Sequence, residues 1–149
     1  MKPLNFPSDV KLREKLEPTE LAYMAGIIDG EGCITINHAR SWQCLSGYTN
    51  MLQIKVAMTT YQVPYWLLDK CGGSLREQPS AHKLIYVWTI SSRQASNLLS
   101  QLLPYLKNTK AQAEAAIKFQ EGMIAGGYKS IEYLENQESY RLRLQELKC

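Results

Sequence analysis

Apolar residues recur at three- and four-residue spacing in the segment that follows Pro18, namely at Leu21, Met24, Ala25 and Ile28. This spacing places them on one face of a helix, and proline fits the first helical turn. The pattern stops at Gly30 and Gly32. Residues 33–37 then alternate with a period of two, which predicts a half-buried strand running directly out of the helix.

The same reasoning predicts the later elements. Residues 51–59 alternate, with Leu52 and Ile54 on the side that we expect to be buried, and the polar stretch 41–50 before them is typical of a hairpin loop. A short helix is predicted over 63–70, and the pair Gly72-Gly73 is expected to end it. The remaining prediction is strands over 74–78 and 83–90, a helix from Ser91 or Ser92 that Pro104 closes, and helices over 110–124 and 131–148.

This order of elements predicts an α+β fold. A helix, two strands, a second helix, two more strands and final helices give a four-stranded, mainly antiparallel sheet, with helices on one face and the other face free. We expect a single domain over residues 18–149. Residues 1–17 form either an N-terminal arm that orders on a partner or a solvated tail, since they carry four basic residues, two prolines and no clear period.

Three small residues form one stripe along the first helix. Ala22, Gly26 and Gly30 are four residues apart and therefore lie one above another. Glycine inside a helix costs roughly 1 kcal/mol relative to alanine, so this stripe indicates close packing against another backbone. That backbone belongs either to the same chain or to a second copy.

Two carboxylates, Asp29 and Glu31, stand at the end of this stripe. The helix dipole disfavours negative charge at a helix C-terminus, by about 0.3 to 1 kcal/mol at an exposed site. A bound divalent cation would offset this cost, because carboxylate and carbonyl oxygens are the ligands that magnesium prefers. A solvated acidic pair is the alternative.

Composition adds little. The net charge of +3, from 17 Lys and Arg against 14 Asp and Glu, suits an anionic partner without requiring one. The four cysteines show neither zinc spacing nor a disulfide framework, and we expect them to be reduced thiols. No apolar run is long enough for a signal peptide or a membrane span, so an intracellular protein without a membrane partner is expected.

The segment MAGIIDGEGCI at 24–34 resembles the LAGLIDADG motif of homing endonucleases. Two later stretches, WLLDK at 66–70 and LLPYLKNTKAQAEAAIKF at 102–119, are similar to the second and third helical segments of that family. The resemblance covers about residues 19–148. It implies an αββαββα core with a saddle-shaped antiparallel sheet and site-specific, metal-dependent cleavage of DNA by an intron-encoded nuclease.

The resemblance also implies roles for individual residues. Glu31 becomes the acidic ligand of Mg²⁺, with Mn²⁺ or Ca²⁺ as alternatives at the same site, and the Gly30 carbonyl becomes a second oxygen ligand. Lys110 is the candidate basic residue near the attacking water, although a straight count from Pro104 puts Thr109 at the position where relatives often carry lysine. Thr60 falls where relatives place a polar side chain that orients water, and a turn residue is its alternative role.

A single motif implies two chains, because each strand of a duplex needs its own active site. The stripe of Ala22, Gly26 and Gly30 then becomes the interface of a homodimer, and the DNA target is nearly palindromic. The free sheet face is expected to contact double-stranded DNA. The candidate contacts are Thr35, Asn37, Gln53, Lys55, Thr59, Arg76, Gln78 and, on the fourth strand, Tyr86.

The main rival function is that of a maturase, an RNA-binding protein of the same fold that assists intron splicing. The intact Glu31 argues against loss of cleavage but is compatible with a bifunctional protein that also binds RNA. The expected location is the cytoplasm of a prokaryote or an organelle, and the sequence does not distinguish the two.

Overall fold

A computed structural model describes residues 16–40, 48–123 and 130–148. The elements in chain order are α1 (Pro18–Glu31), β1 (Gly32–Arg40), β2 (Tyr48–Met58), α2 (Gln62–Cys71), β3 (Ser74–Pro79), β4 (Leu84–Ser91), α3 (Ser92–Leu102), the 3₁₀ turn η2 (Leu103–Tyr105), α4 (Lys110–Glu121) and α5 (Ile131–Lys148). None of the helices in the described ranges is long and apolar enough to cross a membrane.

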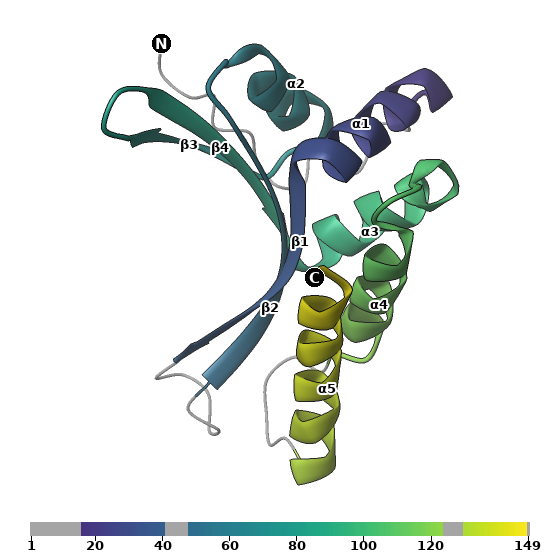
Figure 1. Ribbon diagram of the computed structural model, residues 1–149. Coiled ribbons are helices and arrows are strands. Elements are labelled where there is room, and N and C mark those ends of the chain that lie inside the picture. Colours follow the sequence, from purple (N-terminus) through teal and green to yellow (C-terminus); the bar gives the residue numbers. More distant parts are fainter. Residues whose placement is uncertain (1–15, 41–47, 124–129, 149) are drawn as a thin grey trace.

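The four strands form one antiparallel sheet in the order β1-β2-β4-β3. The sheet is curved, and Figure 1 shows helices along its convex side while the concave side faces away from them. The predicted α+β class, the order of elements and the free sheet face are therefore confirmed. The division into an arm and a domain stays a prediction, because residues 1–15 lie outside the described ranges.

The core lies between the sheet and the helices. On β2, Leu52, Ile54 and Val56 are fully buried, as the alternation predicted, while Gln53 and Lys55 between them are partly exposed. The largest buried side chain, Trp88 of β4, donates its indole N–H to the Gly72 carbonyl at 2.8 Å. This bond satisfies the one polar group of a side chain that otherwise packs against apolar atoms.

Local sequence explains where the helices start and stop. Pro18 occupies the first turn of α1, and the Glu17 and Glu20 side chains form a reciprocal capping box there. Helix α2 ends at Cys71, directly before Gly72 and Gly73, which both have positive φ, as the glycine pair predicted. Helix α2 begins at Gln62, two residues before Pro64.

The first hairpin is longer than predicted. Strand β1 continues past the predicted residue 37 to Arg40, and β2 already starts at Tyr48, so residues 48–50 of the polar stretch assigned to a loop belong to β2. The paired register runs from Gly32 opposite Val56 to Arg40 opposite Tyr48. Residues 41–47, the rest of that predicted loop, lie outside the described ranges, as does the last residue of the helix predicted over 110–124.

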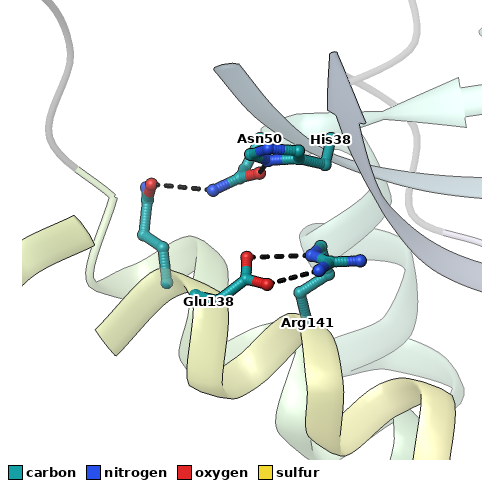
Figure 2. Close-up of polar contacts among 5 residues, drawn as sticks. His38, Asn50, Glu138 and Arg141 are labelled. Atoms are coloured by element: carbon teal, nitrogen blue, oxygen red, sulfur yellow. Dashed lines mark hydrogen bonds and ion pairs between the residues drawn. The ribbon is translucent and has the colours of Figure 1, made fainter. Parts of the chain in front are cut away.

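Polar contacts hold α5 against the outer part of this hairpin. The His38 imidazole Nδ1 lies 2.6 Å from the Asn50 side-chain oxygen, and the Asn50 amide donates to Gln137 of α5 at 3.1 Å. Figure 2 shows these contacts beside the Arg141–Glu138 ion pair on α5. Because Asn50 and Gln137 are both buried, their bond satisfies two polar groups at the contact between α5 and the sheet.

Candidate functional site

Glycine makes possible the abrupt exit from α1 into β1 that places Glu31. Helix α1 ends at Glu31 and β1 begins at the next residue, so the chain changes from helix to strand without a loop. A Cβ added at Gly32 would lie 2.7 Å from the Ile28 Cα and 2.8 Å from the Ile28 carbonyl oxygen. Only glycine fits there without a shift of the backbone. The buried Ile28 fixes one side of the helix end, and the Glu31 side chain is exposed.

Asp29 binds the loop that precedes α4. Its Oδ2 accepts the Lys107 backbone N–H at 2.9 Å, and its Oδ1 accepts both the backbone N–H and the hydroxyl of Thr109, at 2.9 and 2.7 Å. Thr109 is the residue at the N-cap of α4. These three bonds, together with the nearby positive end of the α4 dipole, offset the cost of a carboxylate at the α1 C-terminus.

The same bonds govern the ionisation of Asp29. Burial of the carboxyl raises its pKa, but the bonds from Lys107 and Thr109 act in the opposite direction and outweigh it. The pKa of Asp29 therefore lies below its ordinary value of 3.8. Asp29 is a charged group held by the protein itself, and the two acids at the end of α1 have different surroundings.

Glu31 and Gly30 supply oxygen atoms at the exposed end of α1. The Gly30 carbonyl belongs to the last turn of the helix, where carbonyl oxygens lack helical partners. A carboxylate and a carbonyl suit a hard divalent cation such as Mg²⁺, which usually keeps several waters and takes few protein ligands. The described residues contain no cluster of three or more His, Cys, Asp or Glu that could hold a metal. The pair thus fits a magnesium ion that takes its remaining oxygens from water and a phosphate.

The other two predicted catalytic residues, Lys110 and Thr60, belong to the start of α4 and to the connection between β2 and α2. Lys110 is exposed at the first position of α4, one residue after the Thr109 that binds Asp29. Thr60 is exposed between β2 and α2, four residues past Val56, which pairs with Gly32. A further exposed cation, Lys107, belongs to the loop that Asp29 holds. Their catalytic roles stay predictions.

The small-residue stripe of α1 faces outward. Ala22, Gly26 and Gly30 are all exposed, and a Cβ added at either glycine would meet no heavy atom within 4 Å. Within the described part of the chain, therefore, no segment packs on the two glycines. The opposite side of α1, with Met24 and Ile28, is fully buried.

The concave sheet face gathers most of the residues predicted to contact DNA. The register places Thr35 opposite Gln53, and Lys55 between Cys33 of β1 and Thr89 of β4. Arg76 stands opposite Val87, which in turn pairs with Ala57, so β3 presents Arg76 on this face as well. The residues of the concave face from the predicted set are Thr35, Asn37, Gln53, Lys55, Arg76 and Gln78. Thr59 is exposed one residue beyond the end of β2.

The assignment of Tyr86 to this face was wrong. Tyr86 pairs with Met58 and shares the helix-covered side of β4 with the buried Trp88, and its ring packs edge-on against Tyr61 at the start of α2. Both faces of β4 are largely apolar, so the sequence offered no polar marker to distinguish them. Thr89, which the prediction missed, lies on the concave face opposite both Lys55 and Ser74.

Comparison with known families decides the identity of this arrangement. The sequence model described as LAGLIDADG endonuclease matches residues 24–125, which is more than half of the chain. The chain belongs to the LAGLIDADG endonuclease family. The matched region includes the motif helix from Met24, the whole sheet and α4. No curated protein matches the sequence.

Solved structures of homing endonucleases share the fold. I-CvuI, in complex with the I-CreI target in the presence of 2 mM Mg, is 20% identical with a TM-score of 0.77, covering 87% of this chain and 82% of that one. The archaeal intron-encoded I-Vdi141I, complexed with DNA, is 16% identical with a TM-score of 0.76, covering 89% and 86%. I-TnaI is 19% identical with a TM-score of 0.67, covering 91% and 95%. The predicted family, fold and class of DNA-cleaving hydrolase are confirmed.

Proposed function

We propose that two copies of this LAGLIDADG endonuclease pair through α1 and cleave one long, nearly palindromic DNA site with a divalent cation. The observation that carries this proposal is the position of Glu31. This exposed carboxylate stands where the uncovered stripe of α1 ends and where β1 enters the concave, polar sheet face. One residue is thus adjacent to a surface free for a second chain and to a surface free for a duplex.

The proposal of a homodimer rests on the exposed stripe. Gly26 and Gly30 leave the α1 backbone open, which lets a second helix approach more closely than the usual 8 to 10 Å. A symmetric pair brings the two Glu31 residues to the same interface, one for each DNA strand. A two-fold protein also favours a two-fold target, which explains the near-palindrome.

In each site, Glu31 and the Gly30 carbonyl would hold the cation. When bound, a divalent cation stabilises charge on the phosphate and lowers the pKa of water. The similar structures of I-CvuI are complexes with target DNA in the presence of 2 mM Mg or 2 mM Ca, which supports a divalent ion as the cofactor. Lys110 would stabilise the attacking water by its charge, and the Thr60 hydroxyl would orient that water by a hydrogen bond.

Selection from a library of random DNA duplexes tests this function. Purified protein is incubated with the library and Mg²⁺, and the cleaved ends are sequenced. The expected product is one family of sites with two related half-sites, cut in both strands. The control is Glu31→Gln in Mg²⁺, together with wild type in EDTA, both of which should leave the library intact.

Three results would overturn the proposal. Cleavage by Glu31→Gln at the rate of the wild type would remove Glu31 from the site. Recovery of sites without two-fold relation would argue against a symmetric dimer. Binding of structured RNA with no cleavage of any duplex would favour the maturase alternative, which shares the fold and for which the described residues provide no specific support.

A further inference from the structure

The loop between η2 and α4 is fastened to the motif helix through Asp29. Both carboxylate oxygens accept bonds from this loop, from the Lys107 N–H at 2.9 Å, the Thr109 N–H at 2.9 Å and the Thr109 hydroxyl at 2.7 Å. The Asn108 amide adds a longer contact, 3.5 Å, to the Asp29 carbonyl. Three successive residues of one short loop therefore contact a single residue that is far away in the sequence.

This fastened loop has two kinds of residues. Leu106 and Thr109 are buried, which anchors the loop at both ends, whereas Lys107 and Lys110 are exposed. Their Cα atoms are fixed, because Lys107 offers its own N–H to Asp29 and Lys110 follows Thr109 directly into α4. Asp29 itself is one residue before Gly30 and two before Glu31. The lysines and the proposed cation ligands are consequently placed by one carboxylate.

We propose that Asp29 is a positioning residue that holds the 107–110 loop so that its lysines stand beside Glu31. The inference rests on the proposed cleavage function and deepens it. This assigns Asp29 to the loop and Glu31 to the cation, because both Asp29 oxygens already accept hydrogen bonds from the loop. The end of α1 thus carries Asp29 for the loop and Glu31 for the ion. This division accounts for two carboxylates at a helix C-terminus, where the helix dipole disfavours negative charge.

Thr109 gains a role from this geometry. The sequence count placed Thr109 where relatives often carry lysine, and this chain uses the position for a hydroxyl that binds Asp29 at 2.7 Å. A hydroxyl carries no positive charge. A positively charged side chain beside the site therefore has to come from a neighbouring residue of the loop, Lys107 or Lys110. The bond to Asp29 then determines the path of the backbone that carries them.

Variants of Asp29 and Thr109 test the proposal in the full-length dimer with a cleavable target. Asp29→Asn replaces one acceptor oxygen with an amide that faces a donor, and Thr109→Val removes the hydroxyl at nearly constant shape, whereas Thr109→Ser keeps it. Glu114→Gln, an exposed acid-to-amide change within α4, is the matched control. The measurements are the single-turnover cleavage rate with saturating protein in Mg²⁺, the Kd for target DNA in Ca²⁺, and backbone amide exchange at Lys107 and Thr109.

We expect a reduced cleavage rate with unchanged binding. Thr109→Val should lower the cleavage rate about tenfold and Asp29→Asn about a hundredfold, the range expected for removal of one hydrogen bond and for disruption of a charged group. The Kd should stay within about twofold in both. Amide exchange at Lys107 and Thr109 should accelerate in Asp29→Asn, and Thr109→Ser and Glu114→Gln should cleave like the wild type.

The outcomes separate this inference from the function on which it rests. If the wild type cleaves no duplex, the proposed function fails and the inference fails with it. If the wild type cleaves, and Asp29→Asn and Thr109→Val cleave equally fast, only the positioning role is overturned. A parallel fall in DNA affinity, thermal stability and rate would reduce Asp29 to a structural role, as would failure of Thr109→Ser to restore the rate. If Asp29→Asn does not fold, Thr109→Val and Thr109→Ser decide the question alone.

Discussion

Gly73 and Thr89 approach each other so closely that no side chain fits between them. A Cβ added at Gly73 would lie 2.3 Å from the Thr89 carbonyl oxygen, and the backbone at Gly73 has a φ of +86°. This contact seats the start of β3 against β4, because Ser74 is the first residue of β3 and pairs with Thr89. The glycine pair after α2 thus serves the sheet as well as the helix end.

We therefore expect Gly73→Ala to destabilise the fold by at least about 2 kcal/mol, because strain at positive φ and a clash with a carbonyl oxygen add together. For a chain of this size the melting temperature should fall by at least about 4 °C. Thermal unfolding followed by circular dichroism measures the change. Gly122→Ala is the control, since its added Cβ would come no closer than 3.7 Å to the Lys118 carbonyl oxygen. Equal decreases in the two variants would contradict the steric explanation.

The fold could be predicted from the sequence where one local signal dominated. Pro18 marked the start of α1, and the alternation of Leu52, Ile54 and Val56 marked the buried side of β2 correctly. The ends of the first hairpin were missed, because polar residues there still pair in the sheet as far as Arg40 opposite Tyr48. Strand pairing satisfies backbone groups whatever the side chains are, so hydropathy alone does not show where such a ribbon stops.

The candidate site could be predicted from the sequence only where its residues are contiguous. Glu31 is a candidate because it belongs to one continuous motif, and its role stays a prediction. The hydrogen bonds between Asp29 and Thr109 join residues that are 80 positions apart in the sequence, and no local sequence pattern predicts them. Tyr86 was assigned to the wrong face because side-chain alternation defines two faces but does not say which one the helices cover.

The exposed stripe predicts the outcome of a substitution at Gly26. Gly26→Leu should leave the fold of a single chain intact, because an added Cβ would meet no heavy atom of the described residues within 4 Å beyond its chain neighbours and the nearby backbone of α1. It should abolish dimer formation, since the leucine side chain keeps a second helix away. Sedimentation velocity at micromolar protein should show a monomer for the variant and a dimer for the wild type, with equal helical content by circular dichroism. A wild-type monomer, or a variant that stays dimeric, would argue against pairing through α1.

The exposure of Glu31 predicts a separation of binding from cleavage. Glu31→Gln keeps the shape of the side chain and removes the charge that would hold the cation. Cleavage in Mg²⁺ should fall by at least about a thousandfold, which corresponds to about 4 kcal/mol less transition-state stabilisation. DNA affinity should be unchanged or tighter, because repulsion between Glu31 and phosphate is removed. Single-turnover cleavage and a filter-binding titration on one target measure the two effects, with Glu121→Gln at the end of α4 as the control.

The ion pair on α5 predicts a small dependence of stability on pH. Two hydrogen bonds from Arg141 lower the pKa of Glu138 below 4.5, burial acts against them, and the charges of Arg141 and His38 lower it further. Because the folded-state pKa is depressed, the stabilisation is complete above the unfolded-state pKa and disappears as the pH falls through the folded-state value. A partly exposed pair of this kind contributes about 0.5 kcal/mol or less.

Glu138→Gln should therefore unfold more easily than the wild type at pH 7, and the difference should shrink as the pH falls below 4.5. Urea unfolding at a series of pH values measures this difference, and 1 M NaCl should reduce it at pH 7 because salt screens a partly exposed pair. Glu135→Gln, an exposed acid-to-amide change one turn earlier on α5, controls for the removal of one negative charge. A difference between wild type and Glu138→Gln that keeps the same size at every pH would show that packing, not charge, is the cause.

Lys55 and Arg76 on the concave face are predicted to have different roles in DNA binding. Lys55 is expected to contact a phosphate whatever the sequence, and Arg76 is expected to recognise a base. The register fixes both directions, because Lys55 pairs with Thr89 between the buried Ile54 and Val56, and Arg76 pairs with Val87. The Arg76 guanidinium also donates to the Gln78 side chain at 3.2 Å, which orders it before DNA arrives. A lysine ammonium carries charge without a fixed shape, whereas an arginine can donate two parallel bonds to guanine.

Lys55→Ala should consequently weaken binding to all sequences alike and reduce the slope of log K against log salt by about one unit for each phosphate that the protein no longer neutralises. Arg76→Ala should instead relax the preference at one base pair in each half-site, by about 1 to 3 kcal/mol, and symmetrically because a dimer presents the residue twice. Affinity for a panel of single-base target variants at two salt concentrations separates the two effects. Arg143→Ala on α5, away from the concave face, is the control for removal of one positive charge. If both concave-face variants bind every target as the wild type does, DNA does not lie on this face. Loss of a phosphate contact would change the salt dependence, and loss of a base contact would change the sequence preference.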